Sequence, residues 1–162
     1  RAVLFLQYVP DDVGGHADDL VLRGTPAGAP SDEIRYALSG TGVPPGPCVP
    51  TGQALCLNND RFKVQSHFLT GAAASGQAGA VELTSDTGYL FFFSPSNVEA
   101  VVKVLNACSF NNRYWVFAGG LTDVRTVITV TDTQRDRVKT YINPLGTRYQ
   151  PIQDTSAFAT CP

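Results

Sequence analysis

Cysteine is the residue type with the most definite chemistry in this chain of 162 residues, which contains Cys48, Cys56, Cys108 and Cys161. Their spacings of 8, 52 and 53 residues match no CxxC zinc or redox motif. Disulfides are the better interpretation, and of the possible pairings we favour Cys48–Cys56 as a local clip and Cys108–Cys161 as a tie on the C-terminus. The alternative is four reduced, buried thiols.

The composition also bears on where the protein resides. The sequence contains no methionine and begins with Arg1, as expected of a processed, exported chain or an excised fragment. Disulfides form and persist in oxidising compartments. We therefore expect a secreted or cell-surface protein, either extracellular or periplasmic.

Four aspartates could form a metal site. Asp11, Asp12, Asp18 and Asp19 bracket one predicted hairpin loop, where their carboxylates could supply oxygen ligands for Ca²⁺. Their spacing differs from that of an EF-hand loop, and aspartates are common in turns because their side chains accept hydrogen bonds from nearby backbone amides. Calcium is the only cofactor that the sequence suggests, and ordinary turn residues are the alternative.

Histidines are too few to indicate a catalytic site. His16 lies in a predicted turn and His67 near the end of a predicted strand, on the same face as Gln65. With two histidines in the chain and no motif-like pair of carboxylates, a general acid–base or nucleophilic site is not indicated. We expect a protein that is not an enzyme.

Aromatic side chains could instead bind a ligand. Tyr89, Tyr114 and Trp115 could stack on a sugar or a peptide if they are exposed, whereas they would fill the core if they are buried. Alternation along a strand places Tyr114 and Val116 on one face of the strand and Trp115 and Phe117 on the other. One of these two sets can therefore be outside.

Charge and hydropathy exclude two classes of partner. Apolar residues make up 43% of the chain, charged residues 16%, and the net charge is −2. Nucleic-acid binding requires clustered positive charge, which is absent from the sequence. No apolar run approaches 18 residues, so no transmembrane helix is predicted.

Hydrophobic periodicity predicts an all-β chain, folded as antiparallel, immunoglobulin-like (Ig-like) β-sandwiches. Strands are predicted at residues 2–9, 19–23, 34–38, 61–68, 80–83, 88–93, 100–105, 114–118, 124–132 and 138–142. Residues 97–105 also fit a short helix, but their valines favour a strand. Residues 133–136 are predicted to join two strands as a hairpin, and the apolar run 89–93 is expected to lie centrally in a sheet.

One segment is typical of a linker. Residues 39–52 contain four glycines and four prolines, a composition that can neither pack nor pair extensively. We assign residues 1–43 to an incomplete Ig-like module, 44–52 to the linker and 53–162 to a C-terminal β-sandwich.

Two resemblances extend this interpretation. Residues 2–42, with the terminal motif LSGTG at 38–42, resemble the last half of choice-of-anchor-D-like bacterial surface modules. From Cys48 onward the chain resembles a recurrent C-terminal module of bacterial secreted proteins, through LCL at 55–57, RFKV at 61–64, GYLFFFSP at 88–95, YWVF at 114–117 and LTDV at 121–124. The resemblances imply an exported bacterial β-sandwich, and they carry over no functional residues.

The N-terminal segment suggests how such a module would act. The first strands of the Ig-like module are missing, so Ala2, Leu4 and Leu6 would lie on a strand whose edge is open to pairing. We therefore expect a structural or assembly module of a surface protein or filament, which binds a protein partner or itself. The alternatives are a carbohydrate- or ligand-binding accessory domain and an accessory subunit of a larger surface complex.

Overall fold

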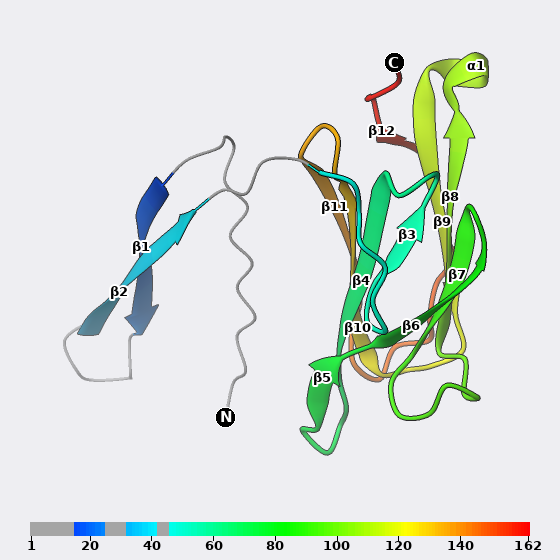
Figure 1. Cartoon of the computed structure of the whole chain (residues 1–162). Helices are drawn as coiled ribbons and strands as arrows, with labels where there is room; N and C mark the ends of the chain where they lie inside the picture. Colours follow the sequence, from blue (N-terminus) through cyan, green and yellow to red (C-terminus); the bar gives the residue numbers. More distant parts are fainter. Residues whose placement is uncertain (1–14, 25–31, 42–45) are drawn as a thin grey trace. The chain divides into compact units, whose positions relative to one another are not determined.

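The computed structural model describes residues 15–24, 32–41 and 46–162. The chain divides into two compact units, Arg1–Pro44 and Pro45–Pro162 (Figure 1). The units are described separately below. In both, the regular structure is almost entirely antiparallel β-sheet, so the all-β prediction is confirmed.

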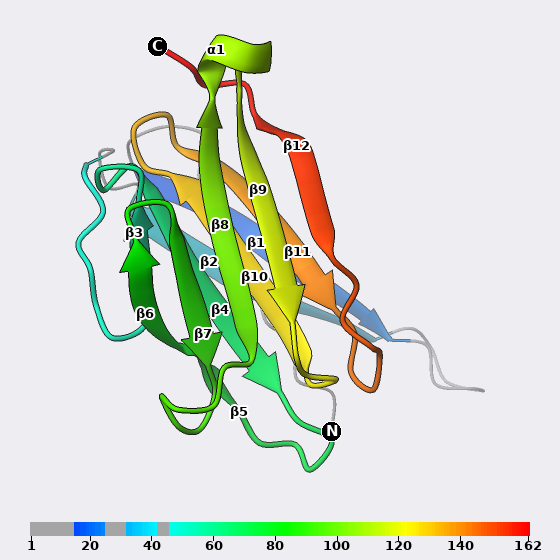
Figure 2. The same cartoon turned by 90° about the vertical axis from the view of Figure 1, so that its right-hand side faces the viewer.

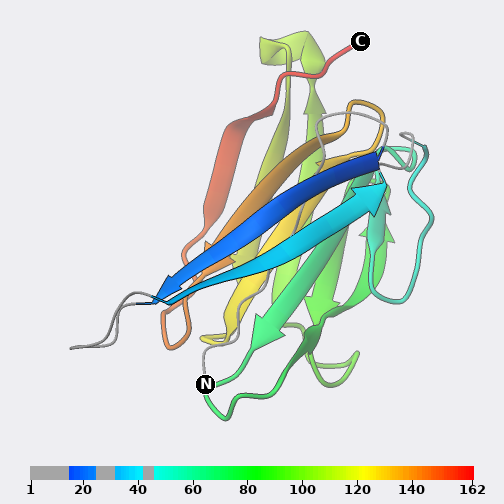
Figure 3. The same ribbon diagram turned by 90° about the vertical axis from the view of Figure 1, so that its left-hand side faces the viewer.

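The first unit contains a two-stranded antiparallel sheet (Figure 3). Strands β1 (Gly15–Gly24) and β2 (Asp32–Thr41) pair over their full length, from Gly15 opposite Thr41 to Gly24 opposite Asp32. Both strands were predicted, but each is longer than expected. Residues 15–18, expected in a turn, belong to β1, and residues 39–41, expected in the linker, belong to β2.

Several sequence-based predictions lie outside the described residues. These are the strand at 2–9, the edge residues Ala2, Leu4 and Leu6, and the candidate calcium ligands Asp11 and Asp12.

The second unit is a sandwich of two antiparallel sheets (Figures 1 and 2). The first sheet has the order β11-β10-β4-β3, with β5 also paired to β4. Its strands are β3 (Leu55–Leu57), β4 (Phe62–Leu69), β5 (Ser75–Gln77), β10 (Arg125–Asp132) and β11 (Arg137–Asn143).

The second sheet has the order β12-β9-β8-β7-β6 and faces the viewer in Figure 2. Its strands are β6 (Gly79–Thr84), β7 (Thr87–Phe91), β8 (Ala100–Ala107), β9 (Arg113–Gly120) and β12 (Ile152–Phe158). A single helical turn, α1 (Cys108–Asn111), connects β8 to β9. The helix alternative for residues 97–105 is therefore excluded, and the predicted hairpin at 133–136 joins β10 to β11.

The core lies between the two sheets and is built from alternate residues of each strand. In β4 and β8, for example, buried and partly exposed side chains alternate along nearly the whole strand. The largest fully buried apolar side chains come from both sheets: Phe62, Leu55, Leu57, Leu90, Ile128, Val64, Val102, Val104, Val116 and Val130. Branched residues suit this pleated surface.

The C-terminal half of the predicted linker packs onto this sandwich. Cys48 is buried, and its N–H donates to the carbonyl of Asp60 at 2.6 Å. Thr51 forms a β-bridge with Ala54. Residues 48–52 thus belong structurally to the second unit.

Candidate functional site

The sandwich contains both of the disulfides that the sequence favoured. Cys48–Cys56 and Cys108–Cys161 have Cα–Cα distances of 5.5 and 5.7 Å, and no cysteine is free. The first bond is local and ties Cys48 to the middle residue of β3. The second joins α1 to the penultimate residue of the chain, and Figure 2 shows the C-terminus beside α1.

A buried ion pair lies where β4 begins and β10 ends. Arg61 Nε donates to Asp132 Oδ1 at 3.0 Å and Arg61 Nη2 donates to Oδ2 at 2.7 Å, while the exposed fractions of the two residues are 6% and 0%. Thr160, two residues before the last, contacts both charges, since its carbonyl accepts from Arg61 Nη2 and its hydroxyl donates to Asp132 Oδ2. The hydrogen bond with Asp132 raises the pKa of Arg61 despite the opposing effect of burial.

The carboxylate of Asp132 is fully engaged within the fold. Asp132 Oδ1 also accepts from the backbone N–H of Gln134 at 3.1 Å, so both carboxylate oxygens are already hydrogen-bonded. An Arg–carboxylate pair with two parallel hydrogen bonds fixes the orientation of both side chains. The sequence alone did not indicate the pair, because it depends on the register that places Phe62 opposite Asp132.

Tyr114 lies in the core, which is one of the two alternatives that the sequence left open for it. It is 4% exposed and its side chain faces the core, where its hydroxyl accepts from Arg61 Nη1 at 3.0 Å. The guanidinium lies 4.5 Å from the centre of its ring. Alternation along β9 correctly placed Tyr114 and Trp115 on different faces of the strand, but only the packing shows that Tyr114 is the inner residue of the two.

The outward side of β9 carries a partly exposed aromatic cluster, defined by Phe110, Trp115 and Phe117. Trp115 lies 5.4 Å from Phe110 and 6.1 Å from Phe117, with interplanar angles of 89° and 74°. Its indole N–H donates to Asn111 Oδ1 at 2.9 Å. Phe110 is 80% exposed, whereas the other two rings are half-buried.

Tyr89 lies apart from this cluster, on β7. It is half-buried, and its hydroxyl donates to the carbonyl of Pro95 at 2.9 Å. The run 89–93 was expected to lie centrally in a sheet. Its first three residues belong to β7, which pairs with β6 on one side and β8 on the other. Its side chains are not all buried, however. Tyr89 and Phe91 are partly exposed on one face of β7, and Phe93, beyond the end of the strand, is 63% exposed.

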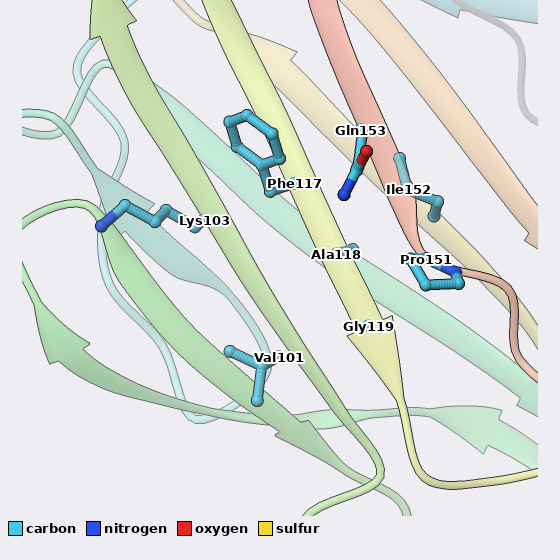
Figure 4. Close-up of a pocket in the computed structure, with 8 residues that line it drawn as sticks. All are labelled: Val101, Lys103, Phe117, Ala118, Gly119, Pro151, Ile152 and Gln153. Atoms are coloured by element: carbon cyan, nitrogen blue, oxygen red, sulfur yellow. The ribbon is translucent and has the colours of Figure 1, made fainter.

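An open groove of about 210 Å³ lies across β8, β9 and the start of β12 (Figure 4). Phe117 stands between Lys103 and Gln153, which are its register partners on the neighbouring strands. Val101 and Pro151 complete its apolar wall. The groove contains no pair of acidic and basic groups suited to catalysis among its lining residues.

The charge of Lys103 is compensated outside the groove. Its ammonium lies 3.3 Å from the carboxylate of Asp86. Hydrogen bonds from the hydroxyls of Thr87 and Thr84, followed by the effect of Lys103, lower the pKa of Asp86. The groove therefore offers an apolar surface with weak net charge.

The remaining candidates are not brought together. Asp18 and Asp19 lie in β1, opposite Leu38 and Ala37, instead of in a loop. His67 lies on β4, as the predicted strand implied, and is exposed. Across 15–24, 32–41 and 46–162, no group of three or more His, Cys, Asp or Glu residues could hold a metal ion.

Comparison with protein-family models, curated proteins and solved structures found no match for this chain. The fold and the site define the class of protein as an antiparallel β-sandwich with two disulfides. In the part of the chain that the structure describes, no helix has the length and apolar character needed to cross a membrane.

Proposed function

We propose that this chain is a non-enzymatic extracellular module of a bacterial surface protein or filament, and that it associates with another protein chain by β-strand pairing. The carrying observation is the two-stranded sheet β1–β2 of the first unit. The two disulfides of the second unit support an oxidising location, because such bonds are rare in the cytosol.

The β1–β2 sheet has a physical reason to accept further strands. Each strand has ten residues and, among the described residues, pairs only with the other. An isolated two-stranded sheet is marginally stable in water, and its outer edges present unpaired N–H and C=O groups. An added strand would satisfy these groups through main-chain hydrogen bonds.

Sedimentation velocity of the full chain, combined with hydrogen exchange, tests this proposal. We expect association as the protein concentration rises, with β1 and β2 amides protected in the associated fraction. Residues 45–162, which contain the core cluster of the sandwich and both disulfides, are the matched control and should remain monomeric. Strong protection of β1 and β2 in a monomeric chain would show that no added strand is needed and would contradict the proposal.

A second candidate function is ligand binding at the aromatic cluster, which places Trp115 and Phe117 on one outward face. A sugar-stacking platform needs coplanar rings, and the angles of 89° and 74° do not supply them. This geometry favours protein association over carbohydrate binding. Glycan-array binding by the full chain that is lost in Trp115→Ala would reverse that preference. An accessory subunit of a larger complex would instead co-purify with a partner from its source.

A further inference from the structure

We propose that the Cys108–Cys161 disulfide is a redox-sensitive clamp, whose reduction loosens the aromatic cluster on one side and the buried Arg61–Asp132 pair on the other. This inference concerns the second unit alone and does not depend on strand pairing by β1 and β2. It rests on what lies next to each of the two sulfurs.

On the side of Cys108, the disulfide is attached to α1, the short segment that positions the aromatic cluster. Cys108 is the first residue of α1, and the helical turn carries Phe110 and Asn111. Phe110 packs edge-on against Trp115, and Asn111 accepts the indole N–H. Asn111 Nδ2 also donates to the carbonyl of Thr155 on β12 at 3.1 Å. The orientation of Trp115 therefore depends on where α1 is held.

On the side of Cys161, the bond fixes the residue next to Thr160. Thr160 supplies one acceptor to Arg61 and one donor to Asp132, the two buried charges. Release of this residue would leave each buried charge with one hydrogen bond fewer, which is costly in a medium of low polarity. The disulfide thus keeps in place a segment that both charges need.

The other disulfide is a natural control. Cys48–Cys56 closes a separation of 8 residues, and Cys48 and Cys56 are 5% and 3% exposed. In contrast, Cys108 and Cys161 are both partly exposed and close a separation of 53 residues. A reductant therefore reaches Cys108–Cys161 more readily.

The reaction requires a dithiol reductant. One thiolate of the dithiol attacks a sulfur of the Cys108–Cys161 bond and forms a mixed disulfide, and the second thiolate then displaces the protein sulfur. The protein gains two electrons and two protons as two thiols, and the dithiol is oxidised to a disulfide. The Cys108–Cys161 bond is the only covalent bond of the protein that breaks.

Trp115 reports the predicted change directly, because it is the only tryptophan of the chain. Dithiothreitol is added to the folded full-length protein, and thiol labelling followed by peptide mapping identifies the bond that opens. We expect the emission of Trp115 to shift to longer wavelength, and its quenching by acrylamide to increase, as Cys108–Cys161 opens. Far-UV circular dichroism should remain that of the sandwich.

Two double variants separate the bonds. In C48S/C56S the shift on reduction should persist, whereas C108S/C161S should show the shifted emission before any reductant is added and no further response. Unchanged Trp115 emission after proven reduction of Cys108–Cys161 would overturn the proposal. Loss of the whole sandwich signal together with the shift would also overturn it, because the reduced chain would then unfold as a whole instead of loosening at the cluster.

Discussion

Arg61 and Asp132 are the residues at which a single substitution has the clearest energetic consequence. Each charge is removed from water, and each is compensated mainly by the other through two hydrogen bonds. Removing one partner leaves the other as an uncompensated buried charge, which costs more than the pair itself contributes.

We therefore expect Arg61→Met to lower the free energy of unfolding by about 3 to 5 kcal/mol, measured by urea denaturation. The double variant R61M/D132L should recover much of this loss, because it removes both charges and leaves apolar side chains. Lys103→Met is the matched control, since the pair with Asp86 is partly exposed, and it should cost less than about 1 kcal/mol. Equal losses in R61M and K103M would show that burial of the Arg61–Asp132 pair does not matter.

Elements with regular alternation were predictable from the sequence, and short or irregular ones were not. β4, β10 and β11 were predicted to within one residue at each end, because apolar and polar residues alternate in β4 and because β10 is rich in β-branched residues. β3 and β5 have three residues each and so present no period. β12 was missed because residues 153–156 are all polar and show no apolar alternation, and its pairing with β9 is irregular between Asp154 and Phe158.

The end of β9 shows how one element is fitted to its neighbour. A Cβ atom added at Gly120 would collide with the ring of Tyr149, which is buried, whereas one added at the adjacent Gly119 would meet nothing within 4 Å. We expect Gly120→Ala to lower the unfolding free energy by about 1 to 3 kcal/mol, because the ring must move. Gly119→Ala should change it by less than about 0.5 kcal/mol. Thermal denaturation of both variants checks this prediction, and similar melting temperatures would contradict it.

At the scale of the whole molecule, the sequence predicted the framework better than the site. Cysteine spacing led to both disulfides, since pairing of Cys48 with its nearest partner leaves Cys108 for Cys161. The site needed three-dimensional information. Alternation separated Tyr114 from Trp115 but could not tell which of them faces the core, and Thr160 lies far along the chain from the charges that it contacts.

The two disulfides should contribute unequally to the stability of the second unit. In the chain-entropy description, a crosslink restricts the unfolded chain more when it closes a longer loop. The separations of 8 and 53 residues then correspond to about 2.5 and about 4 kcal/mol. The longer loop contains β9 to β12, which form one edge of each of the two sheets, so its closure restricts strands of both sheets.

We accordingly expect C108S/C161S to lower the urea midpoint of unfolding more than C48S/C56S does. Cys48 and Cys56 are buried, so serine at those positions adds a cost of burying hydroxyls, which opposes this order. Cys48→Ala/Cys56→Ala, compared with Cys108→Ala/Cys161→Ala, removes that difference and leaves the loop-length effect. If the alanine pair at 48 and 56 were the more destabilising, native contacts around Cys48 would outweigh the restriction of the unfolded chain, and loop length would not govern the stability of this sandwich.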